Sequence, residues 1–194
     1  MKPILTLLAL PLLLSGCISF GAKPPPQLLT LQPDAALQAG QTQSTGTSQT
    51  ITIGVPASSQ ELAAPRIPVH RGGVAIAYVK DAVWVEVPSR LFARLLADTV
   101  TARTGRVVLS NRQSQIDPGA QLTGELRMFG VDEATNEAVV TYDAVLQRGE
   151  APVFEKQRFE ARVPVAKIEA TPAAAALSQA ANQVAAQVAD WVGK

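Results

Sequence analysis

The feature of this sequence that most restricts its fold is a series of three long strand-like segments, 121–131, 138–148 and 153–165. Two short polar stretches, DEATNE and GEAP, separate them. Consecutive strands joined by such turns pair antiparallel, so the pattern predicts a three-stranded meander. Charged residues alternate along it and indicate one solvent-exposed face, so the other face needs an apolar cover; the residues concerned are Glu125, Arg127, Glu155 and Arg158.

Two amphipathic helices are predicted to provide that cover. The first spans 90–103 and is followed by Gly105, at the place where a helix commonly ends in a left-handed residue. Its apolar stripe consists of Leu91, Phe92, Leu95, Leu96 and Val100. The second is the Ala-rich C-terminal segment, with Thr171 as expected N-cap and Pro172 at the first position. Its seam is expected to pack in the core rather than line a lipid groove, and consists of Leu177, Ala181, Val184, Val188 and Trp191.

Shorter strands are expected before the meander. They cover 28–31, 51–55, 74–79, 82–87 and 107–109, and Lys80–Asp81 is expected to form a short turn between 74–79 and 82–87. The polar stretch 38–50 is predicted to be a flexible loop. Together the elements predict one α+β domain over 28–194, a mainly antiparallel sheet with two amphipathic helices packed on one face.

Charge and cysteine content exclude several classes of protein. Lys and Arg number 17 against 16 Asp and Glu, so the formal net charge is +1 and no basic stripe for nucleic acid is present. The single cysteine cannot form an intramolecular disulfide, so the core must be stable without one.

The single cysteine lies directly after a short apolar run at the N-terminus. Lys2 and the run from Ile4 to Leu14 are typical of a secretory signal, because a membrane-spanning helix needs about 20 apolar residues. The run ends in Leu-Ser-Gly-Cys, which matches the bacterial lipobox. We therefore expect residues 1–16 to be a lipoprotein signal peptide and Cys17 to carry a diacylglyceryl thioether and acyl chains that anchor the protein in a membrane.

The residues after the anchor predict its location. Residues 17–27 contain three consecutive prolines and are expected to form an extended tether. Ile18 rather than Asp follows Cys17, and in Gram-negative lipoprotein sorting the absence of Asp at this place favours the outer membrane, facing the periplasm.

Signatures of catalysis are missing from the sequence. It has no phosphate-binding loop, and after Cys17 no apolar run is long enough for a permease. His70 is the only histidine and lies beside a glycine pair, so a loop or strand-edge histidine is favoured over a catalytic or metal-binding one. We expect no enzyme activity, no cofactor and no metal; a lipid-anchored hydrolase is the least favoured alternative.

Tyr78 and Trp84 are the aromatic residues with two competing interpretations. They are expected on neighbouring strands, either as core side chains between sheet and helix or as an exposed aromatic patch that binds a partner. Both are therefore candidate partner-binding residues.

The order of these features resembles the ABC-type transport auxiliary lipoprotein family, which includes the lipoprotein of the paraquat-inducible Pqi system. The lipobox is followed by the Pro-rich PPPQLLTL and then by RIPVHRGGVAIAYVKDAVWVEVPSRLFARLLADTVTARTGR. In the family's central pattern, an Arg-led strand precedes a Tyr, a Trp and a Pro before the amphipathic helix; here these are Arg66, Tyr78, Trp84 and Pro88. Where family members often show a Tyr pair in the first strand, this chain has Gln27-Leu28-Leu29-Thr30.

The resemblance implies a non-catalytic role in an envelope transport system. Such systems combine an ABC ATPase, a permease and a periplasmic subunit with an MCE (mammalian cell entry) domain that carries lipids between membranes. The lipoprotein would receive that MCE subunit at the outer membrane, and it could also form homo-oligomers. An alternative is a structural or assembly lipoprotein that binds an outer-membrane β-barrel, because fold alone does not determine function.

Overall fold

The structure is a computed structural model that describes residues 27–46, 49–110, 112–115, 119–149 and 153–194. The predicted signal peptide, Cys17 and all of the tether except Gln27 lie outside these residues. The strands are β1 (Thr50–Ile53), β2 (Ala57–Ser58), β3 (Arg66–Arg71), β4 (Ala75–Val83), β5 (Val107–Leu109), β6 (Ala120–Asp132), β7 (Glu137–Gln147) and β8 (Phe154–Pro164). The helices are α1 (Pro88–Thr104) and α2 (Ala170–Val192), with the short 3₁₀ helices η1 (Gln60–Leu62) and η2 (Gln113–Gln115).

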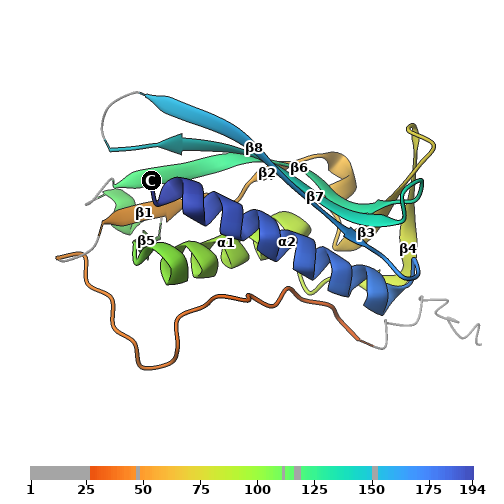
Figure 1. The fold of residues 1–194 in the computed structure, drawn as a ribbon, viewed down its shortest axis with the longest axis horizontal. Helices are drawn as coiled ribbons and strands as arrows, with labels where there is room; N and C mark the ends of the chain where they lie inside the picture. Colours follow the sequence, from red (N-terminus) through yellow and green to blue (C-terminus); the bar gives the residue numbers. More distant parts are fainter. Residues whose placement is uncertain (1–26, 47–48, 111, 116–118, 150–152) are drawn as a thin grey trace, which may run out of the picture.

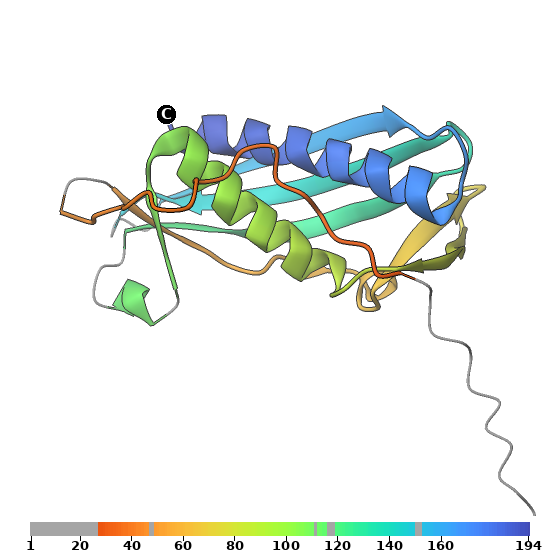
Figure 2. The ribbon, with the colours of Figure 1, turned by 90° about the horizontal axis from the view of Figure 1, so that it is seen from below.

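The elements form three layers. The twisted sheet lies on one side and both long helices cover the same face of it (Figure 1). The N-terminal segment 27–46 then runs across the outer surface of the two helices (Figure 2). We call this segment the strap. The fold class α+β with two helices on one sheet face is therefore as the sequence predicts.

The sheet is mixed, which corrects the expectation of a mainly antiparallel one. The predicted meander is present, since β6, β7 and β8 pair antiparallel. Among the described strands, however, four of the seven pairings are parallel: β1 with β5, and β1, β2 and β3 with β6. The reason is that β1, β2 and β3 follow one another along a single edge of β6, and α1 supplies the crossover connection that parallel pairing needs.

The strands before α1 differ from the prediction at one turn. The predicted turn at Lys80–Asp81 is wrong, because β4 runs through both residues and Asp81 takes a positive φ of 55° within it. The chain instead turns at Gly72 and Gly73, with φ values of 56° and 81°. Glycine adopts these angles without the steric cost that a side chain brings. This turn joins β3, which ends at Arg71, to β4, which begins at Ala75.

Two smaller expectations are also corrected. Residues 28–31 form no strand, and only Leu29 makes a bridge, to Trp84. The second helix begins at Ala170 with Glu169 as N-cap, because the Ala173 N–H already donates to the Glu169 carbonyl at 3.0 Å. The left-handed helix end at Gly105 is confirmed, with φ 69°.

The core lies between the sheet and the two helices. The apolar stripe predicted for α1 is buried, and so are the seam residues of α2 from Leu177 to Val188, which confirms core packing. Phe92 of α1 and Tyr142 of β7 meet edge to face at 5.3 Å between ring centroids. Each fully buried side chain of this size contributes about 1.5–3 kcal/mol. In the part of the chain that the structure describes, no helix is both long and apolar enough to span a membrane.

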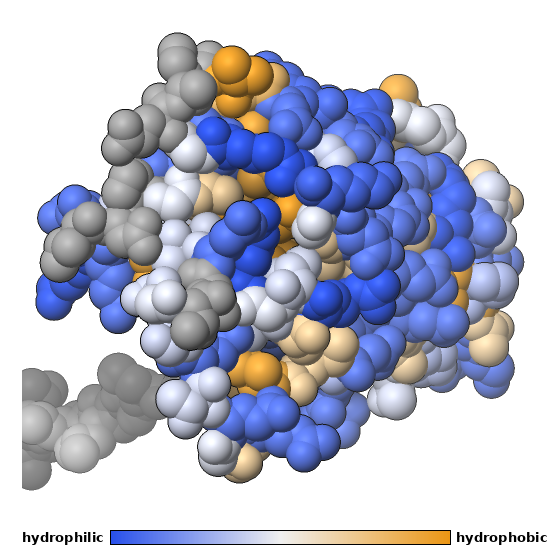
Figure 3. Space-filling view, turned by 60° about the vertical axis from the view of Figure 1, so that its left-hand side comes forward, coloured by the Kyte–Doolittle hydropathy of each residue, from blue (hydrophilic) through white to orange (hydrophobic). Residues whose placement is uncertain are grey.

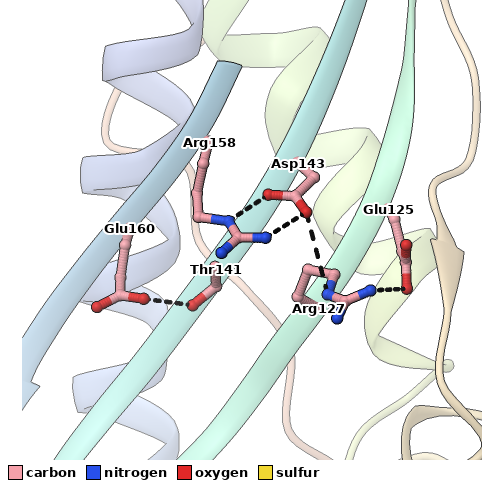
Figure 4. Close-up of polar contacts among 6 residues, drawn as sticks. All are labelled: Glu125, Arg127, Thr141, Asp143, Arg158 and Glu160. Carbon is pink, nitrogen blue, oxygen red and sulfur yellow. Dashed lines mark hydrogen bonds and ion pairs between the residues drawn. The ribbon is translucent and has the colours of Figure 1, made fainter. Parts of the chain in front are cut away.

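The outer face of β6, β7 and β8 carries paired charges, as the alternation in the sequence predicts (Figure 4). Arg158 makes two hydrogen bonds to Asp143, of 2.6 and 2.7 Å, and Arg127 binds Glu125 at 2.9 Å. The hydrogen bond from Arg158, helped by the charge of Arg127, holds the pKa of the Asp143 carboxyl below its usual value. This face is therefore polar with its charges satisfied by one another.

Candidate docking surface

The hairpin formed by β3 and β4 projects from one end of the molecule (Figure 1). Its tip is apolar and exposed, with Val74 at 96% and Ile76 at 45% of their full accessibility. Apolar side chains at a projecting tip gain nothing from folding, because they remain in water. The tip of the β3–β4 hairpin is therefore a candidate docking surface.

Tyr78 lies on the same face of the hairpin as Ile76, two residues further along β4. Its ring stacks against the guanidinium of Arg66, 4.1 Å from the ring centroid. Its hydroxyl donates to the carbonyl oxygen of Glu61 in η1 at 3.4 Å. These contacts fix a half-buried aromatic ring next to the exposed tip.

His70 sits opposite Ile76 in the β3–β4 register. Its Nε2 lies 3.4 Å from the Glu61 carboxylate but makes no hydrogen bond within the described residues. In that same part of the chain, no group of three His, Cys, Asp or Glu residues could hold a metal ion. His70 is therefore a residue of β3 beside a single carboxylate.

The charges near the tip are paired inside the hairpin region. Arg71 binds Glu133, which follows the end of β6, at 2.7 Å, and Arg66 is stacked on Tyr78. The exposed pair Lys80–Asp81 lies further from the tip, towards the base of β4. Val74 and Ile76 therefore lie beside an exposed ion pair whose two charges offset each other.

Trp84 occupies a different place from Tyr78. The two residues do not stand on neighbouring strands, because Tyr78 is within β4 and Trp84 directly follows its end. Trp84 is 1% exposed and packs edge to face against Phe129 of β6, with ring centroids 5.8 Å apart. Its ring is thus a core contact between hairpin and meander, and only Tyr78 of the two lies close to the candidate surface.

Sequence reasoning missed Val74 and Ile76, the two large apolar side chains that the hairpin exposes. The signal was present as a glycine pair followed by the apolar run Val74–Ala77. A glycine pair between two strand-like runs is typical of a hairpin turn. Had the turn been placed there, the apolar run would have been predicted at an exposed tip.

The strap begins at this end of the molecule. Gln27 donates to Thr171 at the start of α2, at 3.3 Å. Asn182 of α2 then holds the strap by two hydrogen bonds: its amide donates to the Gln32 carbonyl at 2.8 Å and accepts from the Asp34 N–H at 2.9 Å. Gln27, the last residue of the predicted tether, therefore lies at the same end of the domain as the hairpin.

The opposite end contains a polar cleft of about 670 Å³ at the C-terminus of α2. Arg148 donates to the carbonyls of Trp191 and Val192 at 3.1 Å each, and Arg106 donates to Val192 at 3.4 Å. Burial and the nearby charge of Arg148 lower the pKa of Arg106. These cations neutralise the negative end of the helix dipole. Polar side chains dominate this end, with scattered apolar ones between them (Figure 3).

The chain belongs to the family of ABC-type transport auxiliary lipoprotein components, whose model matches residues 29–189. Membership of this family implies a membrane-anchored location in the cell envelope and an auxiliary role in transport. Among curated proteins, none matches the sequence.

Two solved structures share the fold. Protein XCC0632 from Xanthomonas campestris is 18% identical, with a TM-score of 0.67 over 86% of this chain and 94% of that one. A second structure, of an uncharacterized protein, is 15% identical, with a TM-score of 0.62 over 75% of this chain and 93% of that one. At these identities the likeness concerns the fold alone.

Proposed function

We propose that the protein is a lipid-anchored periplasmic accessory subunit of an ABC/MCE-type system that moves lipids or hydrophobic compounds across the cell envelope. It acts without catalysis, by docking the MCE-domain subunit of the transporter. The observation that carries this proposal is the exposed apolar tip of the β3–β4 hairpin, with Val74 at 96% accessibility, on a chain of a transport-auxiliary family.

The anchor is proposed to be the lipidated Cys17, in the outer membrane. The tether from Cys17 to Gln27 would span roughly 30 Å in a polyproline conformation. Because the strap begins at the hairpin end of the domain, a tether of this length leaves the hairpin within reach of a subunit arriving at the membrane surface.

The test is recovery of the tagged protein from crosslinked and gently solubilised envelopes, comparing wild type with Cys17→Ala. We expect an MCE-domain subunit with the wild-type protein and its loss, by about tenfold or more, with the variant that cannot be acylated. The recovered partners are identified by mass spectrometry. As a control, the wild-type protein and the Cys17→Ala variant are compared at equal recovered amounts.

Two outcomes would overturn the proposal. Recovery of an outer-membrane β-barrel with no transporter component would replace it by an assembly role. Recovery of further copies of this chain alone would show a self-association that does not recruit a transporter.

A further inference from the structure

The outer edge of β4 is an unpaired sheet edge for much of its length. Within the described residues β4 pairs with β3 on one side, and on the other side the only backbone pairing is the bridge from Leu29 to Trp84, just after the end of β4. The Leu29 N–H donates to the Val83 carbonyl at 2.8 Å, and the Val85 N–H donates to the Leu29 carbonyl at 2.8 Å. The chain itself thus extends the sheet past the base of β4 and leaves the part near the tip open.

The backbone groups of Ile76 and Tyr78 point to this open edge. The His70 carbonyl accepts from the Glu133 N–H at 3.1 Å, so the backbone of His70 faces away from β4. His70 and Ile76 are therefore a non-hydrogen-bonded pair, and the N–H and C=O of Ile76 face outward. Tyr78, two residues further along, has the same orientation; its partner Pro68 has no N–H to donate.

The features that usually protect an edge strand are confined to the base of β4. A charged pair, Lys80–Asp81, and a register shift of the β3–β4 ladder lie there. Charges and bulges prevent other strands from pairing. The stretch from Ala75 to Tyr78 has neither, and both side chains on its tyrosine face, Ile76 and Tyr78, are apolar or aromatic.

The side chains around the outer edge of β4 determine what kind of segment can bind there. Arg71 is paired with Glu133, Arg66 is stacked on Tyr78, and the Glu61 carboxylate beside His70 is only 16% exposed. The large side chains that a partner meets at the open edge are therefore those of Ile76 and Tyr78. An uncharged segment is complementary to this surface, and it would continue the edge pairing that Leu29 already makes at the base.

We propose that the open edge of β4, at Ile76 and Tyr78, binds an extended, uncharged apolar segment of the recruited transport subunit by β-strand addition. Main-chain hydrogen bonds to Ile76 and Tyr78 hold the segment, and its alternate side chains contact Ile76 and the Tyr78 ring. This inference rests on the proposed function, because it names how the same hairpin receives its partner.

The first measurement is amide hydrogen exchange, resolved by residue, on the folded domain with and without the subunit recovered in the crosslinking experiment. Strand addition predicts that exchange at the Ile76 and Tyr78 amides slows by about tenfold or more on binding, whereas the Ala77 amide, which faces β3, changes little. Binding without slowing at Ile76 and Tyr78 would overturn the inference. Slowing at high protein concentration with no subunit added would also overturn it, because a second copy would then be the occupant.

The second measurement uses Ile76→Pro, with Ile76→Val as the matched control. Proline removes the outward N–H but no β3–β4 hydrogen bond, and proline is tolerated on an edge with this orientation. We expect recovery of the subunit to fall by about tenfold with Ile76→Pro and to stay at the wild-type level with Ile76→Val. An unchanged thermal midpoint shows that the hairpin is intact.

The two proposals fail in different ways. Wild-type recovery of the subunit with Ile76→Pro would overturn strand addition and leave the docking role standing. Failure of the wild-type protein to recover any transporter subunit would overturn the proposed function itself.

Discussion

The two antiparallel regions of the sheet, the meander of β6–β8 and the hairpin of β3–β4, differ in how they meet solvent. In the meander, Asp143, Arg158 and Arg127 form ion pairs across neighbouring strands (Figure 4). In the hairpin, Val74 and Ile76 meet water with no polar cover. The meander pairs its exposed charges with one another. The hairpin exposes apolar side chains, and the outer backbone groups of β4 near its tip have no partner among the described residues.

The difference supports the proposal that the meander is the scaffold and the hairpin is the element that binds the partner. A partner that covered the meander would have to replace ion pairs that already exist, at a cost in desolvation. A partner that covered the hairpin tip would remove apolar surface from water and satisfy free backbone groups. The same sheet thus combines a part whose exposed charges are already paired with a part whose exposed apolar side chains a partner could cover.

The largest expected effect comes from breaking the contact between the two regions. Trp84→Ala should lower the free energy of unfolding by about 3–5 kcal/mol, because it leaves a cavity at the contact of the hairpin base with Phe129. Urea denaturation measures it. Trp84→Phe is the control and should cost less, since it keeps a ring there and removes a buried N–H that has no hydrogen-bond partner among the described residues. A loss below about 1 kcal/mol for Trp84→Ala would contradict the core role.

A smaller effect tests the ion pairs of the meander. The pKa of Asp143 is lowered in the folded protein, chiefly by the hydrogen bond from Arg158, so its stabilisation is present above the unfolded pKa of about 3.9. It is lost as the pH falls through the lower folded value. Asp143→Asn should therefore destabilise the protein at pH 7 and have less effect near pH 2, as measured by denaturation at the two pH values. An equal effect at both would show that the charge of Asp143 is not involved.

The smallest effect on stability is expected at the hairpin tip. Val74→Ser should change the free energy of unfolding by less than about 0.5 kcal/mol, because the side chain is already in water. It should nevertheless lower recovery of the transport subunit by about tenfold. Val153→Ser is the matched control, since Val153 is 65% exposed and lies outside the hairpin. Equal recovery with both variants would exclude the tip from the interface.

Prediction from the sequence succeeded where the signal is local. The meander and both helices follow from hydrophobic periodicity and turn residues, and the buried stripes of α1 and α2 lie where that periodicity puts them. It failed where two local signals compete. The prediction placed the turn at Lys80–Asp81, although Gly72–Gly73 also has residue types that suit a turn, and only the pairing with β3 decides that Asp81 stays inside a strand.

The candidate site was predicted in part. Of the two aromatic candidates from the sequence, Tyr78 lies beside the exposed tip, whereas Trp84 is buried against Phe129. The sequence could not distinguish their two environments, because these depend on where β4 ends and on the contact of Trp84 with Phe129 of β6. Val74 and Ile76 were missed because their exposure follows from the position of the turn.

The sequence by itself determined the class of the protein, which is an α+β domain that follows a predicted lipobox cysteine. It also determined the nearly balanced charge and the single histidine. These properties depend on composition and on neighbouring residues. The tertiary structure alone decided that β1, β2 and β3 align in parallel along one edge of β6, and that no other described strand pairs with the outer edge of β4. Strand order and open edges depend on contacts between residues far apart in the chain, because each backbone hydrogen bond of a sheet joins two segments whose own sequences do not specify the partner.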